Sequence, residues 1–521
     1  MRTMPNIWLS ENDSPGSTTA VLLGPVEETV IAEECAKHPA GVLWITLDAC
    51  ESPQKAPANL KHLKLTPDAG DFPGEVLQSF LGLNYEAIPS IRVSAAIDPT
   101  NAGYLKVLDM VMHQADTTLR ARRTRSANGQ LRQENVFRNL AGYLRGRLPE
   151  SWRGLAQGNL AIVVGAGPSL DITLPFIIKG FGDPLIIAAD SALGALSKHD
   201  ISPDFVVNID PEKSIVSCGS PKNFPGIAVL SSQSHPSWLS AWGEKSCYLS
   251  GRVLTEDWLA SKGLEKTSLE ATNNAGLTAL LLADFLEASV VMLVGMDLAG
   301  SGDKNLRYAH STGRSHQEVQ AMHYHKVPGN HDDFVSTPFL SDYSETSANC
   351  PKVTSRRMVI NFNDRGAQLE GTTVIHPDNA GELRAAVAEN LKPFDRSGGR
   401  LQLRTTLDSS GINQLDALLA QRCDEIWAEL NPLLATDGKL SALDKLQFFR
   451  ALFSQHEIAT LIGDYAFSVM PGILPGKEPT EIELDRWGHG LQRILWLLEE
   501  ALLQTNPSED FLGPFLTKGW D

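Results

Sequence analysis

Short apolar runs, each followed by a turn and a helix-like stretch, recur through the middle of the chain. The first, at residues 160–164, leads through Gly165-Ala166-Gly167-Pro168-Ser169 into a helical pattern. Two more, at residues 185–190 and 205–210, have the same form, and each ends on a carboxylate. Continuous apolar runs of this length are typical of strands buried in a parallel sheet. The pattern therefore predicts a Rossmann-like, mostly parallel sheet whose ligand site lies beyond the carboxyl ends of its strands.

The whole chain is predicted to be an α/β protein of several domains, because 521 residues are too many to fold around a single hydrophobic core. Strand-like and helix-permissive stretches alternate before the central segment, and apolar residues recur at three- and four-residue spacing after it. The predicted parts are an N-terminal α/β domain (1–102), a helical linker (103–150), a central Rossmann-like domain (151–392) and a C-terminal helical domain (393–521).

Two stretches carry more specific expectations. The helical linker carries a basic cluster between Arg120 and Arg138, which residues 126–129 interrupt. This cluster indicates either a solvated helix face or a surface that faces an anion or a partner. Residues 299–351 lack apolar periodicity, and a loop that long is typically a lid, a binding loop or disordered.

Composition excludes several classes of protein. A net charge of −17 and a pI near 5.3 argue against non-specific nucleic-acid binding. Neither a run of about 18 apolar residues nor an apolar signal region is present. The six cysteines are scattered without a Cys-x-x-Cys pair, which indicates reduced structural thiols. We expect a cytoplasmic protein that neither binds nucleic acid nor inserts into a membrane.

The glycine turn after the first run is the leading candidate for ligand binding. Gly165 and Gly167 allow close approach to the backbone, and the following helix start offers N–H groups to an anion. The third glycine of a dinucleotide fingerprint is missing, Pro168 removes one donor, and no triphosphate-binding Gly-Lys-Ser/Thr occurs. The turn, including Ser169, therefore favours a monophosphate or a sugar. The alternative is a tight strand–helix turn capped by Ser169 or Asp171.

Polar residues at other strand and helix ends extend this candidate site. Asp190, followed by Ser191, and Asp210 close the second and third runs. Such carboxylates can accept hydrogen bonds from sugar hydroxyls, hold a divalent metal or cap the next helix. Asp190 also stands where a dinucleotide-dependent dehydrogenase keeps its ribose carboxylate. The turn Thr272-Asn273-Asn274 opens another helix and suits a phosphate or a pyrimidine edge, although capping by Thr272 or Asn273 also explains it.

Candidate catalytic groups follow the predicted strand at residues 289–294. Asp297 ends this strand, and His310 lies further on beside Tyr308. One imidazole that titrates near pH 7 can deprotonate an attacking hydroxyl, so His310 and Asp297 are assigned to catalysis. Tyr308 can donate to a phosphate leaving group. A metal is not expected, although the same stretch holds histidines and aspartates that can ligate one. These are His310, His316, His323, His325, His331, Asp332 and Asp333.

Several blocks, taken in order, resemble the motility accessory factor (Maf) family. They begin with Gly-x-Gly-Pro-Ser-Leu at 165–170 and Ala-x-Asp-Ser-Ala-Leu-x-x-Leu at 188–196. Further blocks lie at 199–204, 209–211, 272–276, 294–299, 327–330, 337, 360–363 and 366–367. The resemblance covers residues 155–375, and the flanking regions fit by their placement.

The resemblance implies a glycosyltransferase of bacterial flagellin, required for flagellum assembly and motility. It would move a nonulosonic acid (pseudaminic, legionaminic or sialic-type) from the CMP-activated donor to Ser or Thr, with no cofactor required. The central domain is also similar to bacterial sialyltransferases, whose Gly-Asn-Gly-Pro-Ser-Leu turn contacts the CMP sugar. This sequence has Ala166 at the Asn position, and Asp190 where those enzymes have a second nucleotide-contacting Asn.

Carried over to this chain, the resemblance assigns roles to the candidate residues. The glycine turn would line the phosphate, Asp190 would hold the donor, and Thr272, Asn273 and Asn274 would hold the nucleotide. Two other functions stay open. The same core is shared with an archaeal-type 6-hydroxymethylpterin diphosphokinase, in which strand-end carboxylates, here Asp210 and Glu212, would hold magnesium for ATP. A chain without catalysis would instead be a flagellin-binding chaperone.

Overall fold

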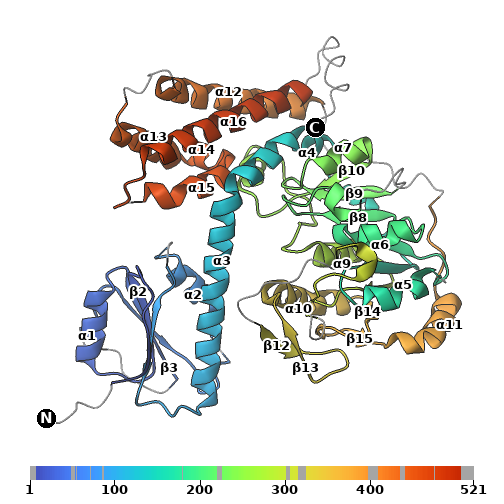
Figure 1. The fold of residues 1–521 in the computed structure, drawn as a ribbon, viewed down its shortest axis with the longest axis horizontal. Coiled ribbons are helices and arrows are strands. Elements are labelled where there is room, and N and C mark those ends of the chain that lie inside the picture. The colour runs from blue at the N-terminus through green and yellow to red at the C-terminus, as the bar shows by residue number, and fades with distance from the viewer. Residues whose placement is uncertain are drawn as a thin grey trace. The chain divides into compact units, whose positions relative to one another are not determined.

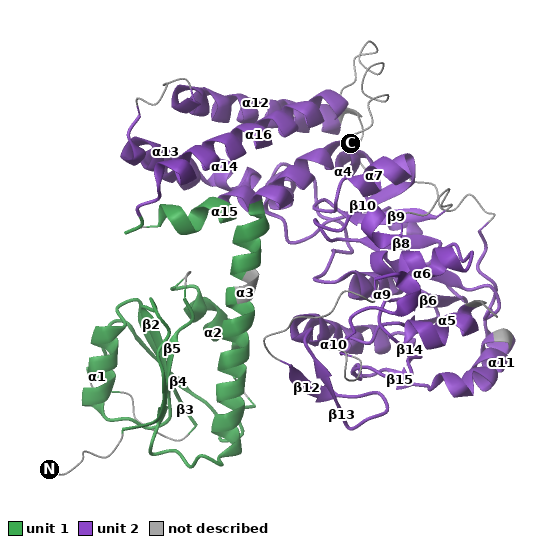
Figure 2. Cartoon of the chain, viewed as in Figure 1, with its two compact units in different colours: residues 1–129, 467–477 green, residues 130–466, 478–521 purple. Residues whose placement is uncertain are grey.

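Two large sheets, a two-stranded hairpin and a following group of helices make up the described part of the chain (Figure 1). The computed structural model describes residues 7–47, 53, 55–70, 72–84, 87–178, 180–219, 226–300, 306–314, 324–396, 409–434, 440–474 and 476–505. The structure confirms the predicted fold class. It has an N-terminal sheet with accompanying helices, a large parallel sheet and a helical C-terminal region. Two compact units are distinguished, Met1–Gly129 with Phe467–Lys477, and Gln130–Ala466 with Glu478–Asp521 (Figure 2). The four-part division stays a prediction.

The first unit is built on a five-stranded sheet of order β1-β5-β2-β3-β4, in which β1 is antiparallel and the other pairs are parallel. Period-two alternation sends Val21 and Leu43 to the face packed by α2 and α3, and Leu22 and Trp44 to the face packed by α1. The elements are β1 (Trp8–Asn12), β2 (Thr19–Leu23), α1 (Glu28–Lys37), β3 (Gly41–Thr46), β4 (Leu60–Lys64), α2 (Gly74–Leu81), β5 (Ser90–Ser94) and α3 (Ala102–Arg138).

Helix α3 runs unbroken through residues 126–129, which interrupt the basic cluster but not the helix. One interior glycine costs a helix about 1 kcal/mol, which packing along the rest of the helix outweighs. The basic cluster is partly used for internal contacts. Arg122 donates to the carbonyls of Leu81 and Asn84 at 2.8 and 2.7 Å, and the Arg125 guanidinium lies 4.4 Å from the Phe467 ring centroid.

The second unit contains an eight-stranded parallel sheet of order β10-β9-β8-β7-β6-β11-β14-β15. From β6 the chain adds strands outward to β10, and from β11 it adds them in the opposite direction. Strand order therefore reverses between β6 and β11, the topological switch point at which open parallel sheets bind ligands. The strands are β6 (Leu160–Val164), β7 (Leu185–Ala189), β8 (Phe205–Asn208), β9 (Ile227–Ser231), β10 (Ser246–Leu249), β11 (Val290–Val294), β14 (Met358–Asn361) and β15 (Thr373–Val374).

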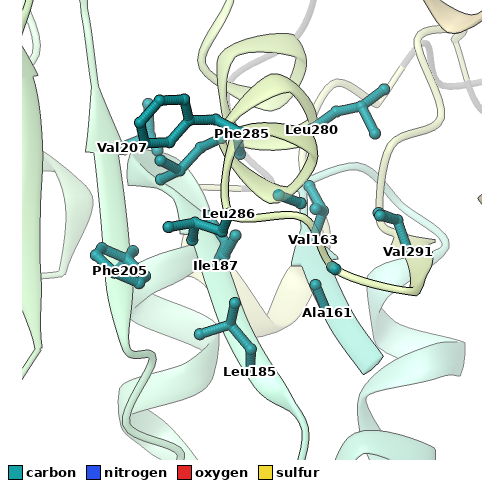
Figure 3. Close-up of a cluster of buried hydrophobic side chains, with 14 of the residues drawn as sticks. Ala161, Val163, Leu185, Ile187, Phe205, Val207, Leu280, Phe285, Leu286 and Val291 are labelled. Atoms are coloured by element: carbon teal, nitrogen blue, oxygen red, sulfur yellow. The ribbon is translucent and has the colours of Figure 1, made fainter. Parts of the chain in front are cut away.

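Helix α9 (Ala275–Phe285) covers one face of this sheet. Its Leu280 and Phe285 pack over strand residues such as Val163, Ile187 and Val207 (Figure 3). All three strand residues are fully buried, which matches the continuous apolar runs in the sequence. The other helices of this region are α4 (Leu140–Arg145), α5 (Leu170–Ile178), α6 (Leu193–Lys198), α7 (Ser237–Trp242), α8 (Leu254–Ser261) and α11 (Ala380–Asn390).

Part of the long loop predicted at residues 299–351 is ordered structure, so that prediction is wrong in part. The segment contains a hairpin, β12 (His325–Pro328) and β13 (Phe334–Thr337), and most of helix α10 (Leu340–Thr354). Helix α10 buries only Thr346, Cys350 and Val353 among its residues. Because this buried face is narrow and partly polar, the sequence of the helix shows no apolar periodicity.

The predicted helical C-terminal region comprises α12 (Ser409–Leu434), α13 (Ala442–Ser454), α14 (His456–Leu461), α15 (Gly463–Ile473) and α16 (Glu481–Thr505). Within the second unit, polar contacts join the end of α3 and the residue after it to the ends of two strands: Asn135 donates to the Pro211 carbonyl, and Asn139 to the Ser232 carbonyl. The chain thus covers the carboxyl ends of β8 and β9 on that side. In the described residues, no helix has the length and apolar character to span a bilayer, and all five described cysteines are buried and free.

Candidate functional site

The loops after β6 and β11 touch across the switch point. A Cβ atom on Gly165 would lie 2.3 Å from the Gly295 carbonyl oxygen, and one on Gly167 would lie 2.2 Å from Asp297 Oδ2. Real Cβ atoms do not approach that closely, so any side chain would force the two loops apart. The glycines that the sequence assigns to ligand approach therefore also have a packing role.

Asp297 binds the start of helix α5 with its own carboxylate. Its Oδ2 accepts a hydrogen bond from the Ser169 amide at 2.9 Å, in the position where helix N-termini attract anions. The Ser169 hydroxyl donates to Asn363 Oδ1 at 2.9 Å, and Ser169 is fully buried. Both polar groups of Ser169 are thus engaged inside the protein, while Gly167 is partly exposed. The assignment of this turn to the donor phosphate stays a prediction.

The second carboxylate oxygen of Asp297, Oδ1, is buried and has no hydrogen-bond partner among the described residues. Burial raises the pKa of Asp297 to about 6, although the bonds from Ser169 oppose the shift. A carboxyl that titrates near neutral pH at a switch point fits an acid–base role. Its assignment to catalysis stays a prediction.

A line of buried amides continues from this point. The Gly295 amide donates to Asn363 Oδ1 at 2.7 Å, Asn363 donates to Asn361 at 2.7 Å, and Asn361 donates to Asn330 at 2.9 Å. These bonds tie the β11 loop to the end of β14 and to the β12–β13 hairpin. The sequence reasoning did not assign these asparagines to the site, although Asn-x-Asn at a strand end was an available signal.

The ends of β7 and β8 form a second polar group, one strand away. Asp190 is 1% exposed and accepts from Ser191 (amide 2.5 Å, hydroxyl 2.9 Å) and from Asn208 Nδ2 (2.8 Å). Lys213 Nζ lies 3.5 Å from both the Asp190 and the Asp210 carboxylates. Burial lowers the pKa of Lys213, but these two carboxylates more than offset that and raise its pKa overall, so it is a cation.

Residues 306–314 contact both the glycine turn after β6 and the polar residues at the end of β7. The Ala309 amide donates to the Ala166 carbonyl in the glycine turn at 2.9 Å. The His310 and Ser311 amides donate to the Asp171 carboxylate at 2.7 and 2.9 Å. His310 is therefore fixed by its backbone, and the residue is exposed. Its assignment as the catalytic base stays a prediction.

Two arginines, Arg307 and Arg314, lie against the ring of Tyr308. The Arg314 and Arg307 guanidinium carbons lie 4.6 and 5.2 Å from the centroid of the Tyr308 ring, within the range of cation–π attraction. Arg314 Nη1 also donates to the Ser191 hydroxyl at 3.2 Å. The sequence reasoning missed Lys213, Arg307 and Arg314. The two arginines flank the singled-out Tyr308 and His310, which was the available signal.

The predicted nucleotide turn lies at the start of α9. Asn274 accepts from the Leu277 amide at 2.7 Å and so caps the helix, a role that the sequence reasoning gave to Thr272 or Asn273. That capping assignment is wrong, because the residue directly before the helix start at Ala275 is Asn274. Thr272 donates to the Asn274 carbonyl at 3.0 Å, and Asn273 donates to the Ser341 carbonyl at the start of α10 at 3.2 Å.

Met296 connects this turn to the switch point. A Cβ on Gly276 would lie 3.2 Å from Met296 Cε, and one on Gly165 would lie 2.9 Å from Met296 Cγ. The structure therefore brings all the predicted site residues to one edge of the sheet, in neighbouring groups. A cavity of about 810 Å³ also runs beside α9 and α10, lined by residues that include Arg252, Thr272, Glu345 and Arg356.

The possible metal ligands are spread out. His331 contacts the Asn363 carbonyl at 2.8 Å and lies against the His376 ring. No group of three His, Cys, Asp or Glu residues that could hold a metal ion occurs in the described part of the chain. His316 and His323 lie outside the described residues. That no metal is needed stays a prediction.

Comparisons with known proteins point to two relatives. The sequence model of the family described as 6-hydroxymethylpterin diphosphokinase MptE-like matches residues 134–303. The chain is also similar to the structure of a Maf glycosyltransferase from Magnetospirillum magneticum AMB-1, with 16% identity and a TM-score of 0.48 over 96% of this chain and 80% of that one. No curated protein sequence matches.

Gly167→Ala is expected to lower the midpoint of thermal unfolding, because its Cβ would displace the Asp297 carboxylate. Overpacking of this kind costs about 1–3 kcal/mol. Gly381→Ala is the matched control, since no atom lies within 4 Å of its added Cβ and its helix favours alanine. Equal midpoints for the two variants would contradict the packing role of Gly167.

Asp297→Asn is expected to change how stability depends on pH. Between about pH 4 and 6 the folded chain binds a proton at Asp297 that the unfolded chain does not, so wild-type stability from this group rises as pH falls. Urea unfolding should show the variant more stable at pH 8, by on the order of 3 kcal/mol, with the gap closing toward pH 5. The exposed Asp378→Asn serves as control. A gap that does not vary with pH would refute the raised pKa.

Proposed function

We propose that this chain is a glycosyltransferase that moves a nonulosonic acid from its CMP-activated form to a Ser or Thr of flagellin. The observation that carries the proposal is the gathering of separate motif blocks at one sheet edge beside the topological switch point. Turn residues after β6, carboxylates after β7 and β8, and the start of α9 all lie there. Sheets of this kind bind their ligands at that edge.

In the proposed reaction, the nucleotide lies near the start of α9 and the sugar lies toward Asp190 and Asp210. The acceptor hydroxyl oxygen bonds to the anomeric carbon while the bond from that carbon to the phosphate oxygen breaks. The electron pair leaves with CMP, and the hydroxyl proton passes to a basic group of the site. Cations and hydrogen-bond donors that face the departing phosphate stabilise the charge that develops on it. Tyr308 would supply one such donor.

The family match at residues 134–303 favours a second candidate, a pterin diphosphokinase. That segment includes the sheet from β6 to β11 and with it most of the site. Such an enzyme transfers a diphosphate from ATP and would use the strand-end Asp210 and Glu212 toward magnesium. The two candidates differ in the nucleotide they bind and in their need for a metal, so ligand binding separates them.

Thermal unfolding of the purified chain with nucleotides tests the choice. A transferase should be stabilised by CMP or a CMP sugar in the presence of a chelator, and by about 2.7 kcal/mol at a ligand concentration of one hundred times Kd. The kinase should instead be stabilised by ATP with magnesium. Asp190→Asn should weaken the stabilisation by the CMP sugar, whereas Asp378→Asn, on an exposed side chain, should leave it unchanged.

Transfer itself is read from the mass of flagellin. Incubation of flagellin with the chain and a CMP-nonulosonic acid should add the mass of one or more sugar residues. An unchanged flagellin mass with every CMP-nonulosonic acid supplied, together with stabilisation by ATP and magnesium alone, would exclude the transferase in favour of the kinase.

A further inference from the structure

We propose that Arg307 and Lys213, assisted by Arg314, bind the carboxylate that a nonulosonic acid carries on its anomeric carbon, and so select acidic sugar donors over neutral ones. This inference rests on the proposed function, and it names the residues that determine donor specificity. None of the three cations belongs to the glycine turn or to the nucleotide turn. They come from the loop after β8 and from the segment 306–314.

Arg307 is the most available of the three cations. It is exposed, and its guanidinium carbon lies 5.2 Å from the Tyr308 ring centroid and 5.3 Å from that of Phe339. Within the described part of the chain, it has no carboxylate within ion-pair distance, 4.0 Å. Contact with two rings holds a guanidinium by its faces and leaves the N–H groups at its edge to bind a carboxylate with two parallel hydrogen bonds.

Lys213 supplies a second, partly satisfied cation. Its ammonium group lies 3.5 Å from Asp190 and from Asp210, at the outer limit of hydrogen bonding, and its side chain is 21% exposed. An ammonium group has three donors, and Asp190 already accepts shorter bonds from Ser191 and Asn208. Lys213 can therefore donate to a ligand without leaving Asp190 unpaired.

Three carboxylates face these cations. Asp190 and Asp210 lie on the Lys213 side, and Asp342 lies on the first turn of α10, whereas the nearby Glu345 pairs with Arg252. Burial raises the pKa of Asp342 to about 6, while Arg307 and Lys213 oppose the shift. Asp342 is three residues beyond Phe339, on the same side of the helix start as the Arg307 contact. Its charge repels an anionic ligand above pH 6, so Asp342→Asn is expected to tighten binding of an acidic donor.

Phosphate and carboxylate would both attract these cations, so the test must separate them. Isothermal titration of the full chain would compare CMP, which has only the phosphate, with CMP-N-acetylneuraminate, which adds the carboxylate. Wild-type protein should bind the sugar nucleotide more tightly than CMP. Arg307→Gln should weaken its binding by about tenfold to a hundredfold, the effect of one hydrogen bond to a charged group, and change CMP binding less than threefold.

Matched variants control for folding and for general charge. Arg493→Gln removes an exposed arginine of α16 that pairs with Glu134, and it should leave both affinities unchanged. Lys213→Met should have the same selective effect as Arg307→Gln. If Lys213→Met fails to fold, Arg307→Gln still decides the matter, because the Arg307 side chain is exposed.

The outcomes distinguish the two proposals. Equal weakening of CMP and CMP-N-acetylneuraminate by Arg307→Gln would place the phosphate, not the carboxylate, at this site and overturn the inference. No effect on either ligand would also overturn it. If wild-type protein binds CMP no more weakly than the sugar nucleotide, the inference fails while nucleotide binding stands. If the wild-type protein binds neither, the proposed function itself fails.

Discussion

The site depends on the close approach of two loops across the β6–β11 switch point. Gly165 and Gly167 allow the loop after β11 to lie against the turn after β6, within distances that exclude any Cβ. That approach brings the Asp297 carboxylate to the Ser169 amide and the Asn363 side chain to the Gly295 amide. Parallel strands only bring their ends to a common edge. These contacts convert that edge into a fixed polar surface.

The same approach changes the interpretation of the glycine turn. A glycine-rich turn before a helix predicts an anion at the helix N-terminus, and an anion is present there, but it is the protein's own Asp297. Positive charge that could bind an anionic substrate therefore comes from residues outside this turn. Lys213, Arg307 and Arg314 lie beside the ends of β7 and β8, where the segment 306–314 crosses from the glycine turn to Asp190.

The parallel sheet and the edge at which it binds ligands could be predicted, because strands that are buried on both faces have continuous apolar runs in their sequence. Val163, Ile187 and Val207 are fully buried, and each lies in a run that the sequence reasoning assigned to a strand. Helix α10 could not be predicted, because a helix that buries two polar or small side chains for every apolar one has no apolar period. Likewise, the continuity of α3 through residues 126–129 depends on packing rather than on local propensity.

The cations were missed for a related reason. Lys213 is far in sequence from Arg307 and Arg314, so only the return of residues 306–314 to the glycine turn, through Ala309 and Ala166, brings them near one another. Charged residues are common on any surface, and their meaning lies in what surrounds them. Two guanidinium groups at one buried tyrosine ring form an arrangement that solvation alone does not require, since each would gain more water contact apart. An anionic ligand gives that arrangement its physical reason.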